Sequence, residues 1–352
     1  MKKRVFIVQF ISIILLISAF FLAIMIGAEK IQLSDFLNIF NQESTSTASN
    51  HFTKIIIFDL RLPRALLVLL TGILLGGSGA VFQLFFRNPL AEPGIMGISS
   101  GATLGAVLAN VFITYTGFQL GVQKIFSANP FNISILNLIS PVNFAAFLGA
   151  LGAGALVTVL AFSNAGKKSS LMLLLCGTAL GTLYSSISSI VLLSSSKELH
   201  SVYTWILGSF NGRGWKELIF ILIPSFLSIF IMFLIARPLD LLTCGETTAQ
   251  SLGVEVNKLR ILVLICGALA VSAAVCAGGT ISFVGLIAPH LVRKMIGSKS
   301  KELIPFSMIF GAILLLLSDS LARVVIAPSE LPAGIITAIL GVPFFLSLCL
   351  KK

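Results

Sequence analysis

Charged residues are scarce in this 352-residue chain. Aspartate, glutamate, lysine and arginine together make up 11% of it, whereas hydrophobic residues make up 57% and the mean hydropathy is +1.04. Soluble domains carry about 25% charged residues, and a soluble fold of this size would need far more polar surface to face water. The composition therefore argues against a large soluble core and predicts an all-α polytopic membrane protein.

Patterns that hold metals or relay protons are also missing. The cysteines lie far apart without a CxxC pair, which indicates neither a metal site nor a disulfide framework, and the histidines lack ligand spacing. Acidic side chains and histidines form no series through the hydrophobic segments, so a proton-coupled secondary transporter is the weaker alternative. The cysteines and histidines are Cys176, Cys244, Cys266, Cys276, Cys349, His51, His200 and His290.

Two short patterns resemble enzyme motifs but lack features that those motifs require. GISSG at 97–101 fits GxSxG, but a proline-rich segment precedes it, whereas a nucleophile elbow follows a strand. AFSNAGKK at 161–168 resembles a phosphate-binding loop, but Ala161 replaces its first glycine and Lys168 replaces its Ser/Thr. We therefore expect this chain not to be an enzyme, not to bind ATP itself, and to hold no cofactor or metal. A membrane enzyme is the weakest alternative.

Ten hydrophobic segments are candidates for spanning helices, which need about 20 mostly apolar residues. An even number places both termini on one side of the membrane. The positive-inside rule puts them in the cytoplasm, because most of the 24 lysines and arginines then fall on that side. This accounts for the net charge of +11 without a nucleic-acid partner. The segments are 5–27, 65–85, 99–115, 142–162, 171–193, 218–235, 259–277, 281–296, 304–326 and 333–350, the eighth being the shortest.

We interpret residues 1–352 as one transmembrane domain with two long connections. The stretch 29–60 is expected outside the cell membrane, and its polar part 41–53, NQESTSTASNHFT, to be disordered. The stretch 236–258 is expected in the cytoplasm, with polar helical character suited to a soluble partner. Between the second and third spans, RNPLAEPGIMG at 87–97 has two open interpretations, a tight loop or a re-entrant element near a pathway.

Small residues recur at a spacing that lets helices approach closely. Three GxxxG pairs predict a compact bundle and say nothing about a substrate. They are Gly72 with Gly76, Gly101 with Gly105, and Gly177 with Gly181.

Six motifs, in order over about residues 55–350, resemble the membrane subunit of bacterial type II ABC importers. They begin with RLPRALLVLLTGILLGGSGAVFQLFFRNPLAEPGIMGISSGA and continue with WILGSFNGRGW, ETTAQSLGV, GGTISFVGLIAPHLVR, LLLLSDSLAR and ELPAGIITAILGVPFFL. That family takes up iron–siderophore complexes, haem and vitamin B12. The resemblance implies a ten-helix permease in the cytoplasmic (inner) membrane that works with two ABC ATPase subunits, a substrate-binding protein and a second permease subunit. The second subunit is expected to be another copy of this chain.

The resemblance also implies roles for particular residues. Arg61, Arg64 and Arg323 match outer arginines that dock the binding protein, with Asp319 orienting Arg323. Positions matching the ATPase-coupling helix are Glu246, Ala249, Leu252 and Gly253, and positions matching the gate and pathway are Ser169, Ser170, Asn88 and Pro89. ATP and Mg²⁺ would bind the partner ATPase. The expected cargo is an iron chelate, siderophore or haem, and cobalamin is the alternative.

Overall fold

The computed structural model describes residues 2–27, 29, 48–116, 140–163, 170–194 and 205–350, and every regular element within these ranges is a helix. The all-α fold is therefore confirmed. In chain order the elements are α1 (Lys2–Met25), α3 (Ala48–Ile55), η2 (Ile56–Arg61), α4 (Leu62–Phe86), η3 (Pro93–Met96), α5 (Ile98–Thr116), α7 (Pro141–Ser163), α8 (Ser170–Leu193), α10 (Trp215–Thr243), α11 (Glu246–Ser251), α12 (Val256–Gly278), α13 (Val284–Ile296), α14 (Ser300–Ala322) and α15 (Ala333–Leu350).

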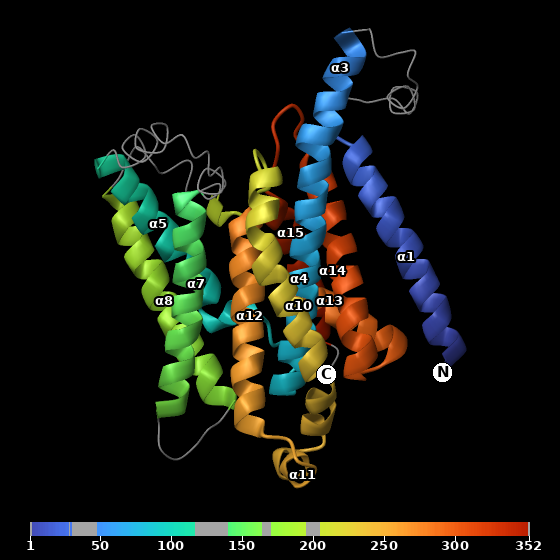
Figure 1. Cartoon of the computed structure of the whole chain (residues 1–352), viewed down its shortest axis with the longest axis vertical. Helices are drawn as coiled ribbons and strands as arrows, with labels where there is room; N and C mark the ends of the chain where they lie inside the picture. The colour runs from blue at the N-terminus through green and yellow to red at the C-terminus, as the bar shows by residue number, and fades with distance from the viewer. Residues whose placement is uncertain are drawn as a thin grey trace, which may run out of the picture.

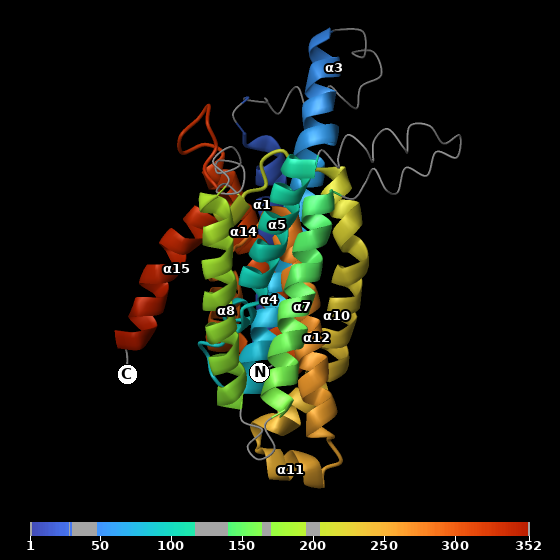
Figure 2. The ribbon, with the colours of Figure 1, turned by 90° about the vertical axis from the view of Figure 1, so that its left-hand side faces the viewer.

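The long helices form one bundle in which successive spans run in opposite directions (Figure 1). α3 marks one end of this bundle and α11 marks the other, and we call them the α3 end and the α11 end. α1 begins and α15 finishes towards the α11 end (Figures 1 and 2). Both ends of the chain therefore lie on one side of the bundle, as an even number of crossings requires.

Eight of the described helices are long and apolar enough to cross a membrane. α13, at the eighth predicted span, has only 13 residues, or roughly 20 Å of helix against a hydrocarbon core of about 30 Å. Residues 279–283 before it are not helical, because Gly279 and Phe283 both have positive φ angles, 74° and 68°. A non-helical stretch followed by a short helix therefore makes this crossing.

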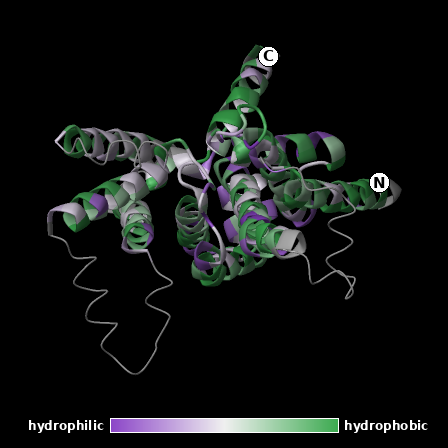
Figure 3. Cartoon of the chain, turned by 90° about the horizontal axis from the view of Figure 1, so that it is seen from above, coloured by the Kyte–Doolittle hydropathy of each residue, from purple (hydrophilic) through white to green (hydrophobic). Residues whose placement is uncertain are grey.

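The bundle is packed most tightly around α4 and α12. Their most apolar stretches are 78% and 83% buried, against 11% for α1 and 17% for α8. Seen from above, the projecting helices are coloured mostly as hydrophobic, and α1 and α15 extend from the bundle as arms (Figure 3). Large hydrophobic side chains on both are exposed, among them Phe6, Phe10 and Ile339. Outward surfaces of this kind fit lipid or another apolar protein surface.

The three GxxxG pairs lie at close helix contacts, as predicted. A side chain at Gly76 would overlap the backbone of α14 at Ser307, and one at Gly105 would overlap the backbone of α7 at Ala145. Gly177 faces the backbone of Met96, in the connection between α4 and α5. The small residues thus allow backbone-to-backbone packing in place of side-chain interdigitation.

Residues 48–60 of the predicted outer loop are helical, so the prediction of disorder is wrong for residues 48–53. α3, the π-helix η2 and α4 follow one another with right-handed helical backbone at both joins. Extending an existing helix gains one hydrogen bond per residue without a new nucleus, so even polar residues can continue α4 outwards. Residues 41–47 lie outside the described part of the chain.

The predicted cytoplasmic connection at 236–258 is shorter than expected. α10 continues to Thr243, because Leu239 and Leu242 are buried against the bundle and keep its last turns packed. The connection between spans is therefore reduced to residues 244–255, which contain the six-residue helix α11.

Candidate functional site

Ionic groups from three separate segments meet inside the α3 end of the bundle. Arg64 of α4 donates to both oxygens of Asp319 in α14, at 2.8 and 3.2 Å, and to Glu330 at 2.8 Å. Asp319 also pairs with Arg323 at 2.9 Å. The side chains of Arg64, Asp319 and Arg323 are at most 10% exposed. The expected contact of Asp319 with Arg323 is present, and Arg64 completes a buried network around the same carboxylate.

Two arginines of this end also cap α1. Arg61 donates to the carbonyls of Ile24 and Met25 in the last turn of α1, at 3.1 and 2.8 Å, and to the carbonyl of Glu29 beyond that helix, at 2.5 Å. Arg323 donates to the carbonyl of Ile26, directly after α1, at 3.1 Å. The last carbonyls of a helix have no partner within it, and a cation there is favourable. These contacts hold the otherwise loosely packed α1 against α4 and α14.

A hollow of about 880 Å³ opens above these groups. Arg61, Arg64 and Arg323 line it, but each residue is less than 10% exposed. The walls carry two exposed aromatic residues, Phe52 and Trp215. The structure therefore brings the three expected docking arginines together, with their guanidinium groups already bonded within the chain. The sequence analysis did not identify Phe52 and Trp215 as lining residues. The position of Phe52 as an isolated aromatic residue in a polar stretch was the signal that could have indicated it.

At the opposite end, α11 is a short helix held between two glycines. Gly245 before it and Gly253 after it have φ angles of 118° and 85°, a region that side-chain-bearing residues avoid. Glu246, its first residue, bonds to Arg260 of α12 at 2.7 Å, and the Arg260 side chain is only 5% exposed. This ion pair fixes the orientation of α11 on the end of α12.

The four expected coupling residues divide by exposure. Ala249 is fully buried, whereas Leu252 is 60% exposed directly after α11. Gly253 lies in open space, and a hollow of about 370 Å³ adjoins it. An exposed leucine on a rigidly held short helix is suited to insertion into a groove of another protein.

The connection at 87–97 is a compact turn whose later residues pack into the bundle, while Arg87 and Pro89 are exposed. The Asn88 side chain accepts from the backbone N–H of Leu90 at 2.9 Å, and Pro89 lies exposed beside it. Ala91 and Met96 are buried, and Gly97, with a φ of 73°, packs against the backbone of α8. Of the two open interpretations, the tight protein-packed turn describes the geometry. Ser170 begins α8, and Ser169 lies outside the described residues.

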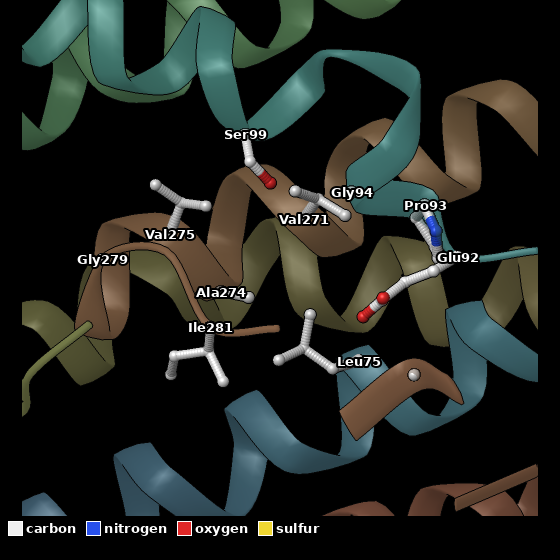
Figure 4. Close-up of a pocket in the computed structure, with 11 residues that line it drawn as sticks. Leu75, Glu92, Pro93, Gly94, Ser99, Val271, Ala274, Val275, Gly279 and Ile281 are labelled. Atoms are coloured by element: carbon white, nitrogen blue, oxygen red, sulfur yellow. The ribbon is translucent and has the colours of Figure 1, made fainter. Parts of the chain in front are cut away.

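Glu92 is the residue of this connection that sequence reasoning did not single out. Its carboxyl group points inward between α4 and the start of α13, beside a cavity of about 10 Å³ that Ser99 and Ile281 also line (Figure 4). The backbone N–H of Phe283 donates to it. Burial raises the pKa of the Glu92 carboxyl to about 7, and the hydrogen bond from Phe283 opposes that rise. A glutamate between two prolines in an apolar region was the signal.

Within the described residues, no group of three or more His, Cys, Asp or Glu side chains is placed to hold a metal ion. The described chemistry is that of ion pairs, helix caps and close packing. Such groups can position helices and present surfaces to other proteins.

A bundle of apolar spans with a half-length helix, an exposed short helix at one end and a buried arginine cluster at the other describes a polytopic membrane protein. The chain belongs to the FecCD transport family, which it matches over residues 14–351. This family comprises the membrane permeases of ABC importers.

Particular relatives extend this result. The chain is 36% identical to the Fe(3+)-citrate import system permease protein YfmE of Bacillus subtilis, covering 85% of this chain and 83% of that one. It is 35% identical to the hemin transport system permease protein HmuU of Yersinia pestis, covering 87% and 86%. A solved structure described as an inward-facing conformation of a metal-chelate type ABC transporter matches all of both chains, at a TM-score of 0.79 and 30% identity.

Proposed function

We propose that this chain is the membrane-spanning subunit of an ATP-driven importer that carries an iron chelate, a siderophore complex or haem. The observation that carries the proposal is the match to the FecCD family over almost the whole chain. Relatives of similar identity that are named for Fe(3+)-citrate and hemin favour iron as the cargo.

ATP hydrolysis belongs to a partner in this proposal, with two ATPase subunits binding ATP and Mg²⁺ at the α11 end. The geometry of α11 supports this role, because Glu246 is bonded to the buried Arg260 and Leu252 is exposed. Closure of the ATPases would push on α11 and, through the Glu246–Arg260 pair, on α12.

The α11 end then faces the cytoplasm and the α3 end faces outward across the cytoplasmic membrane. Lysines and arginines at the α11 end, including Arg237, Lys258, Arg293 and Lys294, support this orientation through the positive-inside rule. Both termini are cytoplasmic in this arrangement.

An extracytoplasmic substrate-binding protein docks at the hollow of the α3 end. Its carboxylates would approach Arg61, Arg64 and Arg323, and the partly exposed Glu330 is the group that a competing carboxylate would displace from Arg64. Charge pairs of this kind set register and encounter rate more than affinity.

A second copy of this chain completes the translocation pathway in our proposal. The outward faces of α8 and α15 are rich in exposed apolar residues, among them Leu183, Ile190, Ile339 and Leu346. α8, which begins at Ser170, is proposed to carry the gate, and Asn88 and Pro89 to shape the adjoining turn at the end of α4.

Uptake of radioactive iron tests the proposed function. Cells with and without this gene would be starved of iron and offered ⁵⁵Fe as citrate, as several siderophore complexes and as haem, with labelled cobalamin in parallel. Loss of uptake of one iron chelate is the expected result. Loss of cobalamin uptake alone would favour the second candidate cargo, which a cobalamin import permease among the relatives supports. No loss in any assay would contradict the importer proposal.

A further inference from the structure

The short helix α13 begins inside the protein, where its first amide groups need acceptors. The N–H groups of Leu286 and Ile287 both reach the carbonyl of Phe283. Phe283 itself is in the left-handed conformation that ends the non-helical stretch 279–283. Phe283 is half-buried, and its own N–H needs an acceptor, either from another part of the chain or from water.

Glu92 supplies that acceptor from the connection between α4 and α5. Its carboxylate accepts from the Phe283 N–H, and its Oε1 atom would lie 3.5 Å from a Cβ atom placed on Gly285, in the first turn of α13. A carboxylate at this place also complements the positive end of the α13 helix dipole. α4 supports the same turn from the other side, where Gly79 packs on the Gly285 backbone.

The same connection is locked to α8 on its other face. A Cβ atom on Gly177 of α8 would lie 2.7 Å from the Cα atom of Met96, and one on Gly97 would lie 2.8 Å from the carbonyl of Gly177. Backbone packs directly on backbone here, so neither element can slide without moving the other.

Hydrogen bonds within the connection make it stiff. The N–H of Asn88 reaches the carbonyl of Gln83 at 3.2 Å, and the N–H of Ala91 reaches the carbonyl of Asn88 at 3.1 Å. With the side-chain contact of Asn88 to Leu90, these bonds fix residues 87–92 as one turn. Contacts of α13 are thus connected to contacts of α8 through a short rigid segment.

We propose that Glu92 is a positioning residue that makes α13, the connection 87–97 and α8 move as one unit during transport. The inference rests on the proposed importer function. In it, α8 carries the gate while α13 leads towards the end where the ATPases bind. Glu92 is the contact through which displacement of one helix reaches the other.

Hydrogen exchange on the reconstituted permease–ATPase complex tests the contact itself. In the Glu92→Ala variant, exchange in the peptide 279–290 should rise about tenfold, because the Phe283 amide loses its side-chain acceptor. Glu92→Gln keeps an oxygen that accepts from Phe283, so its increase should be smaller. Glu302→Ala is the matched control, since it removes another carboxylate from the first turn of a helix, α14, outside this unit. Equal exchange rates in wild type and Glu92→Ala would contradict the proposed contact between Glu92 and the start of α13.

Cargo moved per ATP hydrolysed tests the positioning role. We expect this ratio to fall about tenfold in Glu92→Ala, with Glu92→Gln between it and wild type and Glu302→Ala at the wild-type value. Faster exchange with an unchanged ratio would overturn the role of Glu92 in coupled motion. If Glu92→Ala does not fold, the ratio of cargo moved to ATP hydrolysed in the isosteric Glu92→Gln variant decides whether Glu92 has the positioning role. Because the exchange assay needs no cargo, an error in the proposed cargo would leave its result intact.

Discussion

The two ends of the bundle use charged residues in opposite ways. At the α3 end, Arg64, Asp319 and Arg323 are buried and bond to one another. At the α11 end, Lys258 and Glu255 pair at 2.8 Å with side chains 72% and 66% exposed, and Glu246 is 39% exposed in its bond to Arg260. Buried ion pairs hold helices together only as complete sets, whereas exposed pairs contribute little to stability. The buried ion pairs of the α3 end hold its helices together, whereas the exposed charged residues of the α11 end are accessible to another protein.

Replacing Asp319 by alanine should have the largest effect on stability. It would leave two buried arginines without their shared carboxylate, at a cost of about 3–5 kcal/mol. Thermal unfolding of the purified protein in detergent or nanodiscs measures this. An unfolding midpoint equal to that of wild type would mean that the α3 end is not held by the network.

Replacing Arg61 by alanine should release α1 while leaving the rest of the bundle packed. Loss of its bonds to three carbonyls is expected to lower stability by about 1–3 kcal/mol. Hydrogen exchange should accelerate in residues 20–27 and stay unchanged in α12, which serves as the internal control. Uniform acceleration throughout the protein would instead indicate global unfolding.

Replacing Glu246 by lysine should destabilise the protein less than the loss of Asp319 does, because Glu246 is partly exposed although Arg260 is buried. It should impair transport about tenfold, because α11 would be repelled from Arg260. Unfolding and ATP-driven transport would be measured on the same preparation. The charge-swapped double variant, Glu246→Arg with Arg260→Glu, should recover part of the activity. Full transport by the single lysine variant would remove the coupling role of this ion pair.

Replacing Lys258 by alanine should change stability least, by less than about 0.5 kcal/mol. Its partner Glu255 remains solvated on the surface of the α11 end. A loss comparable to that of the Asp319 variant would erase the contrast between the two ends.

Hydropathy was sufficient to predict most of the fold, because each spanning helix carries its own apolar stretch. It placed α15 at its observed bounds and gave the eighth span as the shortest, but began that span at Ile281, three residues before α13 begins at Val284, because Ile281 and Phe283 are apolar. The polar composition of residues 48–53 led to a wrong prediction of disorder. These residues are helical because extending α4 outwards outweighs their low helix propensity.

Site residues were predictable in position but not in partnership. Arg64 and Asp319 are 255 residues apart in the sequence, so only the packed bundle reveals that they share a bond. Asp319 with Arg323, four apart on one helix, is the pair that spacing could reveal. The position of Glu92 between two prolines marks it in the sequence, but its contact with the start of α13 could be found only once the beginning of that helix was known.

Photo-crosslinking from position 252 tests most directly the claim that the α11 end binds the ATPase. A photoreactive amino acid would replace the exposed Leu252, and membranes from cells that express the complete importer would be irradiated. The account predicts one crosslinked product that contains this chain and the ABC ATPase subunit, identified by mass spectrometry. A product with the extracytoplasmic binding protein, or none with the ATPase, would contradict both the assignment of α11 and the orientation of the bundle.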